Sequence, residues 1–461
     1  MPRIAIVGAG IAGLAIAREV MDEPGVDVVV LEQATRPGGN LRSESLDGFL
    51  VEWGPNGFLD NAPETLALVK RVGLEPALLP SDDRARRRFI FRNGELHLLP
   101  HSPISFVRSG LLSTRGKLRI AGEPFARPRP EGDETIHAFA TRRIGAEAAD
   151  VLIDPMVSGI FGGDARRLSL RAAFPKMWEL ETRHGGLFRA LWARRKAARA
   201  SSAPVGSPLG RLTSFAGGID TLTTTLAGQL GARVRLGARV TGVSRGPASG
   251  AWRLEVSGAP PVEADAVVLT SSPAIASRLT APLDGGMATA LAEIPSAPIV
   301  VVALGHDVLA LDHPLDGFGF LVPRGEGPRI LGALWDSSVY PGRAPRGQAL
   351  IRVMIGGAHD PAVLDLGDDE ITRIVRTDLR LVMGVSAVPR FVRVIRHPAG
   401  IPQYTVGHLD RLARIDRALE RWPGLYLAGN GYRGVAINNC IAEAGPLAAR
   451  VLERLRGSFA A

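Results

Sequence analysis

The chain has almost no cysteine and few aromatic residues. Among its 461 residues there is one cysteine, Cys440, and aromatic residues make up only 5%. A single cysteine excludes an internal disulfide and a metal site built from several thiolates, and it suits a reducing compartment. We interpret Cys440 as a small buried apolar residue. The 46% hydrophobic and 22% charged residues predict a folded globular protein with two or three domains.

Long apolar runs are also missing. The longest candidate, residues 151–163, is interrupted by Asp154 and Pro155. A helix that spans a bilayer needs ~20 apolar residues, so the sequence predicts no membrane crossing. It leaves open that the protein lies on a membrane surface.

No catalytic group stands out in the sequence. The nine histidines are scattered as single residues, and there is no obvious nucleophile, metal cluster or carboxylate pair. We interpret His408 as structural. We therefore predict no metal site and no clear catalytic side chain. A bound cofactor is expected to carry the chemistry while the protein orients the substrate.

Positive charge is concentrated in one segment. The formal net charge is +9, and residues 84–210 contain 23 Lys or Arg against 11 Asp or Glu. Such a segment could meet an anionic lipid surface, an acidic small molecule or nucleic acid. It could equally be a solvated surface in an arginine-rich chain.

The first thirty residues contain a nucleotide-binding pattern. Residues 3–8 and 26–32 read as buried parallel strands, with a helical stretch between them. The turn after the first strand is Gly8-Ala9-Gly10-Ile11-Ala12-Gly13, a Gly-x-Gly-x-x-Gly run. Its glycines allow a tight turn, the approach of a pyrophosphate and close packing of helix on strand. The helix N-terminus, with its free N–H groups, favours the anion.

The segment after the second strand favours FAD over NAD. Glu32 ends that strand, 22 residues after Gly10, where a carboxylate can accept hydrogen bonds from ribose hydroxyls. The run Arg36-Pro37-Gly38-Gly39-Asn40-Leu41-Arg42 follows it. Two glycines and a cation would give backbone approach and charge to the same pyrophosphate. The alternative for Arg42 is an ordinary surface charge.

Later parts of the chain alternate in character. Residues 63–72 read as a helix, and residues 84–200 as arginine-rich with helical patches. Strand-like runs occur at 297–304, 318–323, 330–335 and 349–355, and residues 424–455 read as strand, glycine-rich turn and helix. The cofactor fold is therefore expected to be divided over the start, middle and end of the chain.

Five ordered blocks resemble the protoporphyrinogen oxidase family of the flavin amine oxidase superfamily. They are residues 36–42, 52–57 (EWGPNG), 158–175 (SGIFGGD to RAAFP), 401–408 (IPQYTVGH) and 427–441 (LAGNGYRGVAINNCI). Small departures are Asn439, where the family often has Asp, and Asn40, where amine oxidases commonly have Arg. The aromatic cage and active-site lysine of amine oxidases have no clear counterpart.

The resemblance implies an α/β protein with a Rossmann-like FAD-binding domain split along the chain. We assign residues 1–83, 206–275 and 406–461 to that domain. A helical, membrane-associated domain is expected at 84–205 and a mixed-sheet substrate-binding domain at 276–405.

The family's flavin contacts carry over to positions throughout the chain, and the backbone of Val240 is expected to pair with the adenine. The predicted cofactor residues are Gly8, Ala9, Gly10, Ile11, Ala12, Gly13, Leu14, Glu32, Gly39, Asn40, Arg42, Gly54, Pro55, Asn56, Gly57, Val240, Asn430, Val435, Ala436 and Ile437.

The family's substrate pocket carries over to a smaller set. Arg88 falls where the family holds a propionate, and a cationic fork fits a carboxylate well. Alternatively, Arg88 is an ordinary surface cation in the basic run Arg84–Arg88. The remaining positions are mostly apolar, and core packing accounts for them equally well: Met156, Gly159, Phe318, Gly319, Leu321, Leu334 and Met354.

The activity implied is the six-electron, FAD-mediated oxidation of protoporphyrinogen IX to protoporphyrin IX in haem biosynthesis, with O2 reduced to H2O2. The alternative is oxidation of coproporphyrinogen III to coproporphyrin III. Another oxidase or desaturase of the superfamily and a non-catalytic flavin-binding redox sensor are further alternatives. The expected partners are the porphyrinogen, dioxygen and an anionic membrane surface, but no nucleic acid, and a homodimer is compatible with them. We expect the protein in the cytoplasm, at the inner face of the cell membrane.

Overall fold

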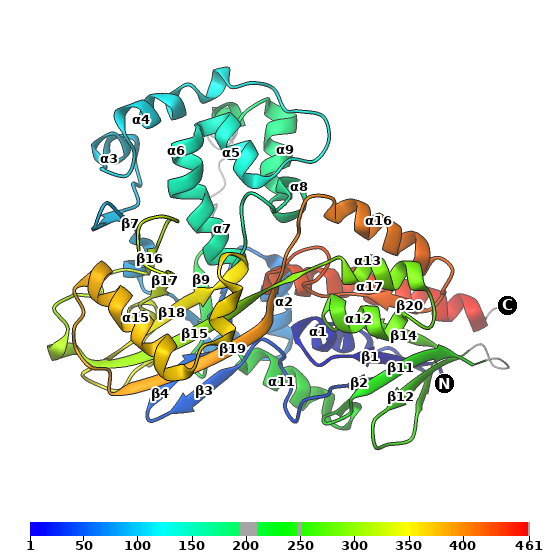
Figure 1. Cartoon of the computed structure of the whole chain (residues 1–461). Helices are drawn as coiled ribbons and strands as arrows, with labels where there is room; N and C mark the ends of the chain where they lie inside the picture. The colour runs from blue at the N-terminus through cyan, green and yellow to red at the C-terminus, as the bar shows by residue number, and fades with distance from the viewer. Residues whose placement is uncertain (191, 194–209, 247–250, 460–461) are drawn as a thin grey trace.

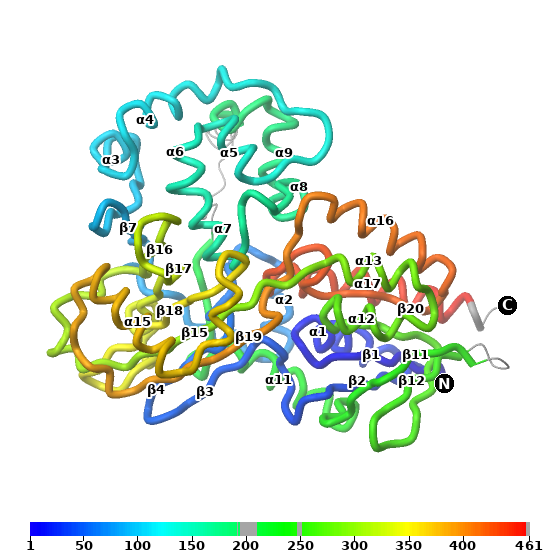
Figure 2. The backbone as a smooth tube through the Cα atoms, in the orientation of Figure 1, coloured from blue at the N-terminus to red at the C-terminus, as the bar shows by residue number. Residues whose placement is uncertain are grey.

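The computed structural model describes residues 1–190, 192–193, 210–246 and 251–459, which form three groups of elements (Figure 1). One group is built on a parallel sheet, a second on a seven-stranded sheet, and a third is helical. In Figure 2 the red C-terminal segment runs beside the blue N-terminal segment, where helix α17 packs on helix α1. The chain therefore leaves its first group and returns to it.

The parallel sheet takes its strands from distant parts of the chain. Its order is β10-β2-β1-β14-β20, all paired in parallel. The strands are Val234–Arg235, Asp27–Leu31, Arg3–Val7, Ala266–Leu269 and Leu425–Leu427, in that order. Strands buried on both faces need continuous apolar runs, which explains the sequences DVVVL and AVVL.

Two layers cover this sheet, because alternate side chains of each strand point to opposite faces. Ile4 and Val28 share one buried cluster with α1 (Ile11–Val20), α2 (Pro63–Arg71), α11 (Thr221–Leu230) and α17 (Ile437–Phe459). On the opposite face, Val29 and Val267 share a second buried cluster with three strands and three helices. These are strands β11 (Val240–Arg245), β12 (Trp252–Val256) and β13 (Val262–Ala264), and helices α12 (Pro273–Thr280), α13 (Gly285–Ala292) and α16 (His408–Leu419).

The second sheet is mixed, with the order β19-β15-β18-β17-β16-β7-β8. All its pairs are antiparallel except β16 with β7. Helix α15 (Asp368–Met383) packs on one face. The strands are Phe391–Pro402, Ser296–Asp307, Gln348–Gly356, Ile330–Leu334, Gly319–Leu321, Arg88–Arg92 and Glu95–Leu98, in sheet order.

The structure differs from the predicted segment limits at two places. Residues 88–98, expected in the helical segment, form β7 and β8, because Phe89 and Phe91 face the α15 side of the sheet while Ile90 faces the helices. Residues 285–292, expected with the substrate-binding segment, form α13 and pack through Met287 and Leu291 on the parallel sheet.

The helical group lies above both sheets in Figure 1. Helix α7 begins at the Asp154–Pro155 interruption noted in the sequence, with Pro155 in its first turn, where a missing N–H costs nothing. No helix in the described ranges is both long and apolar enough to cross a bilayer. The helices are α3 (Pro103–Arg108), α4 (Thr114–Ala121), α5 (Ile136–Ile144), α6 (Ala146–Ala148), α7 (Asp154–Phe161), α8 (Leu170–Ala173) and α9 (Pro175–His184).

Short strands connect the groups. A hairpin joins β3 (Ser43–Leu46) to β4 (Phe49–Glu52), and β9 (Leu212–Phe215) lies between β5 (Phe58–Leu59) and β6 (Leu78–Pro80). Helix α14 (Asp336–Val339) follows β17.

Candidate functional site

The glycine-rich turn lies at the carboxyl edge of the parallel sheet, between β1 and α1. Gly8 has φ +111°, a conformation that side chains rarely adopt, and a Cβ on Gly13 would collide with the Gly8 carbonyl oxygen. A Cβ on Gly10, in contrast, would meet no atom within 4 Å in the described part of the chain beyond its immediate neighbours. Gly10 is the N-cap of α1 and offers no side-chain cap to its free N–H groups. The turn therefore leaves room for an anion beside Gly10.

The predicted ribose acceptor sits beside this turn. The N–H groups of Ala9 and Ala34 each donate to the Glu32 carboxylate over 2.8 Å. These bonds hold the carboxylate at the end of β2. Thr270, which follows β14, supports the turn from the other side by donating its hydroxyl to Val7 O and Gly8 O.

The second glycine pair lies directly on the first motif. Gly38 N–H donates to Ala9 O over 2.8 Å, and Gly38 forms a bridge with Gly10. A Cβ on Gly39 would lie 3.3 Å from Gly10 Cα, so the two turns meet with little space between their backbones. The two runs therefore lie side by side, and their joint contact with one pyrophosphate stays a prediction.

Two arginines flank the paired turns. Arg36 donates to the carbonyls of Pro37 and Gly39 over 2.9 Å each, and burial and the charge of Arg42 lower its pKa. The Arg42 guanidinium stacks on Trp53, 3.3 Å from the ring centroid, and lies 3.6 Å from Glu44. Arg36 was not among the predicted cofactor residues, although its place in the Arg-Pro-Gly-Gly run was a usable signal.

The turn at residues 54–57, within the predicted block 52–57, lies against a buried ionic network. Glu52 is 1% exposed; it accepts from Ser43 Oγ and from the Ile219 N–H and lies 3.3 Å from Arg343. Burial raises the pKa of Glu52 to about 7 against the pull of Arg343. Arg352, held by Asp336, donates to the carbonyls of Glu52 and Gly54.

Within this turn Asn56 carries an unsatisfied group. It is 9% exposed, and its Nδ2 finds no hydrogen-bond partner in the described part of the chain. A buried amide donor without a partner costs about 1–3 kcal/mol, so this atom suits an acceptor supplied by a ligand. The neighbouring glycines fit tightly: a Cβ on Gly54 would lie 2.6 Å from Asn40 O.

The C-terminal block is positioned by two residues of the 401–408 block. Tyr404 donates its hydroxyl to Asn430 O over 2.6 Å and accepts from the Gly434 N–H. His408 is fully buried, stacks on Tyr404 and contacts Tyr432 O through Nε2 at 2.8 Å. His408 thus has the structural role expected of it, while the role of Tyr404 was missed. Val435, Ala436 and Ile437 then lead into α17.

Val240 lies away from these turns in sequence but packs on the parallel-sheet group. It pairs with Val256 in the β11–β12 hairpin and contacts the buried cluster below the sheet. The expected backbone contact with adenine stays a prediction.

The predicted substrate residues lie on neighbouring strands of the seven-stranded sheet. Arg88, Gly319 and Leu334 form one row across β7, β16 and β17. Two residues further along, Leu321 pairs with Gly332, and Gly332 pairs with Met354 of β18. Because residues two apart on a strand share a face, these rows form one surface.

Helix α7 crosses this surface. A Cβ on Gly159 would lie 2.8 Å from Leu321 Cδ2, and Met156 is on the same helix. Phe318 precedes β16 and lies under the Arg88 guanidinium, 5.0 Å away. The structure thus gathers the predicted substrate residues between α7 and the strands, which packing alone would also produce.

Arg88 differs from its neighbours in charge pairing. Arg84, Arg86 and Arg87 pair with Asp82, Asp83 and Asp316. For Arg88, no acidic partner lies within ion-pair distance among the described residues. Arg88 is exposed, and the side chains packed around its guanidinium lower its pKa by partial burial.

Comparison with known proteins gives consistent similarities. The flavin containing amine oxidoreductase family matches residues 11–452. The chloroplastic protoporphyrinogen oxidase of Nicotiana tabacum is 34% identical over 97% of this chain and 84% of its own. The coproporphyrinogen III oxidase of Bacillus subtilis is 30% identical over 95% of this chain and 96% of its own. A crystal structure from Exiguobacterium sp. 255-15, assigned as a protoporphyrinogen oxidase, superposes with a TM-score of 0.85, 26% identity and 99% coverage of both chains.

The chain belongs to the protoporphyrinogen oxidase family of flavin-containing amine oxidoreductases. This membership confirms the predicted resemblance, the α/β fold with mixed sheets and an FAD-dependent enzyme. The residues present fit that cofactor: open space beside Gly10, paired glycine turns, two flanking arginines and the unpaired Asn56 amide. The individual FAD contacts stay predictions.

The space beside Gly10 yields a test. We expect Gly10→Val to fold but to lose FAD, because the added Cβ has open space among the described residues and the side chain would occupy the predicted pyrophosphate position. Flavin absorbance per polypeptide, with circular dichroism for folding, measures this.

Gly367→Val is a matched control. Gly367 is the N-cap of α15, has a similar extended backbone and also has open space at its Cβ. A Gly10→Val protein that keeps full flavin would contradict the assignment of the turn.

Proposed function

We propose that the protein oxidises protoporphyrinogen IX to protoporphyrin IX in haem biosynthesis. Three molecules of O2 accept the six hydrogens removed and leave as three molecules of H2O2. The observation that carries the proposal is Arg88, an arginine without an acidic partner among the described residues, at the end of a largely apolar surface. Relatives named protoporphyrinogen oxidase, 30–34% identical over nearly the whole chain, support it.

The roles of the chain's residues follow from this surface. FAD, when bound, supplies the hydride acceptor and the reaction with O2. Leu321, Leu334 and Met354 would pack against the macrocycle, while Arg88 would pair with one propionate. The protein would thereby orient the substrate, while the flavin ring of bound FAD would accept the hydride.

The bacterial relatives named coproporphyrinogen III oxidase make that substrate the second candidate. Coproporphyrinogen III carries two more propionates than protoporphyrinogen IX. Of the predicted substrate residues only Arg88 is cationic, and its neighbours Arg86 and Arg87 are already paired with Asp83 and Asp316. This charge count favours the less acidic porphyrinogen.

We further propose that the helical group, within the 84–205 segment, docks on the inner face of the cytoplasmic membrane. Ile104 and Val107 on α3 are 67% and 66% exposed, and Leu118 on α4 is 68% exposed. A surface hollow of about 560 Å³ beside α3 is lined by His97, His101 and Arg108, among others, without a carboxylate. Apolar side chains beside cations suit an anionic lipid surface. Four further cations of this segment, at 194–199, lie outside the described residues.

Direct turnover tests the proposed substrate. Under anaerobic conditions, protoporphyrinogen IX should bleach the flavin absorbance, and in air each porphyrin formed should be accompanied by three H2O2. We expect kcat/KM for coproporphyrinogen III to be lower than that for protoporphyrinogen IX by roughly tenfold or more. The two added carboxylates would find no free cationic donor among the predicted substrate residues. A preference for coproporphyrinogen III would select the second candidate, and bleaching by neither would remove both.

Substitution of Arg88 tests the propionate contact. Arg88→Ala should raise KM for the porphyrinogen by roughly tenfold or more, since a charge-assisted hydrogen bond contributes about 1.5–3 kcal/mol. Arg88→Lys should recover part of the loss, because an ammonium cannot make the paired fork contact. FAD content and melting temperature should stay near those of the wild type.

Arg86→Ala is the control for this experiment, since Arg86 lies in the same basic run but pairs with Asp83. If Arg86→Ala and Arg88→Ala raise KM equally, Arg88 is only part of a solvated basic surface.

Liposome flotation tests membrane docking. We expect binding to anionic vesicles that weakens at high salt, because each cation near the surface contributes about 1 kcal/mol that salt screens. The double variant Ile104→Ser/Val107→Ser should bind less, whereas Leu309→Ser, with a 96% exposed side chain in another group, should not change. Equal binding to neutral and anionic vesicles would contradict an electrostatic contribution to membrane binding.

A further inference from the structure

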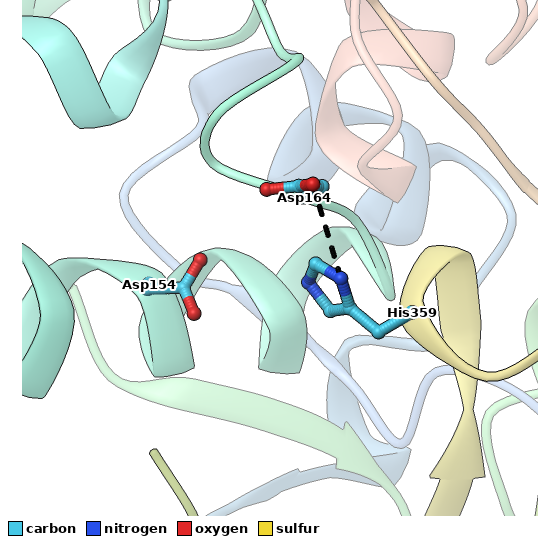
Figure 3. A group of neighbouring side chains, drawn as sticks. All are labelled: Asp154, Asp164 and His359. Carbon is cyan, nitrogen blue, oxygen red and sulfur yellow. Dashed lines mark ion pairs between the residues drawn. The ribbon is translucent and has the colours of Figure 1, made fainter. Parts of the chain in front are cut away.

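One ionic cluster joins helix α7 to the seven-stranded sheet. Asp154 is the first residue of α7 and is 2% exposed, and Asp164 lies three residues beyond its last residue. Figure 3 shows these two carboxylates with His359, which comes from the turn after β18. One carboxylate oxygen of each aspartate and one ring nitrogen of His359 all lie within 4.8 Å of one another.

A single guanidinium fills the centre of this cluster. Arg324 follows β16; its Nε donates to Asp154 Oδ2 over 2.8 Å and its Nη2 to Asp154 Oδ1 over 2.7 Å. The same Nη2 lies 3.1 Å from Asp164 Oδ1, and Nη1 lies 3.1 Å from His359 Nδ1. Arg324 thus supplies one positive charge that the two carboxylates share, and it contacts all three members of the cluster.

The cluster reaches both ends of α7. Asp154 is held at its start, and Asp164 beyond its end. Near that end the Ala358 N–H also donates to Gly162 O over 2.7 Å. Between these points, Gly159 lies so close to Leu321 that a Cβ would come within 2.8 Å of its side chain. The separation of α7 from β16 therefore depends on these contacts.

We infer that Arg324 is a positioning residue that fixes α7 over strands β16 and β17, and thereby sets the width of the surface that takes the porphyrinogen. The inference rests on the proposed function for its substrate. The positioning of α7 by Arg324 rests only on the contacts of Arg324 with Asp154, Asp164 and His359.

A neighbouring arginine supplies a matched control. Arg329 lies five residues further on, its side chain is 38% exposed like that of Arg324, and it also makes a two-point pair with an aspartate. Its partner, Asp360, is not on α7. Loss of either arginine removes a two-point ion pair with an aspartate, but only Arg324 is paired with a residue of α7.

The experiment compares Arg324→Ala, Arg324→Lys, Asp154→Asn and Arg329→Ala as full-length proteins loaded with FAD. Hydrogen–deuterium exchange of residues 154–164 should increase in the first three variants and not in Arg329→Ala. KM for protoporphyrinogen IX should rise roughly tenfold in Arg324→Ala and less in Arg324→Lys, since lost hydrogen bonds to charged groups have effects of that order. FAD content and the flavin spectrum should be unchanged.

Hydrogen–deuterium exchange and KM together separate the positioning role of Arg324 from the proposed function. Unchanged exchange in α7, or an equal rise of KM in Arg329→Ala, would overturn the inference. Faster exchange with an unchanged KM would also overturn it, because α7 would then not set the substrate surface. If the wild-type protein oxidises no porphyrinogen, the proposed function fails, while the exchange data still decide whether Arg324 holds α7.

Discussion

The buried carboxylate of Glu52 is the point at which three distant parts of the chain meet. Ser43 and the Ile219 N–H bind its oxygens, and Arg343 lies within ion-pair distance. A charge so deeply buried is tolerated only when its partners are in place, because desolvation otherwise exceeds the attraction. Burial raises the pKa of Glu52 in spite of these partners. The geometry of the network is therefore strongly specified.

The network connects both walls of the candidate site. Arg343 also donates to Ser214 Oγ and Phe215 O, next to the parallel-sheet group. Arg352, from β18 of the seven-stranded sheet, binds the carbonyls of Glu52 and Gly54. The turn at residues 54–57 is thus held between the two sheets. Movement of either sheet relative to the other would break bonds to buried charges, so the network fixes the two walls at one separation.

The sequence predicted what local pattern determines. The glycine runs and the valine-rich strands signal their structure within a few residues, and these elements lie where they were expected. Strand β7 was missed because its alternation is only five residues long, begins and ends with arginine, and pairs with β16 from beyond residue 300. The Glu52–Arg343 pair and the Tyr404–Asn430 bond join residues that no short-range pattern relates. Helix α13 was misassigned for the same reason, since only its contacts with α12 and α16, in the buried cluster that includes Val267 and Leu269, show which sheet it belongs to.

An arginine-rich chain raises the question of which arginines hold the fold and which face a ligand, and charge pairing within the chain offers an answer. Arg143, Arg324 and Arg352 each bind carboxylates that are almost fully buried, so their positive charge is already balanced and their role is to fix backbone elements. Arg88 lies on the same sheet as Arg352, but it is exposed, with Phe318 below its guanidinium and no acidic partner in the described ranges. A guanidinium whose donors no carboxylate occupies can pair with an anion from outside. We propose that Arg88 selects an acidic substrate in this way, whereas an arginine already paired with a buried carboxylate holds the fold.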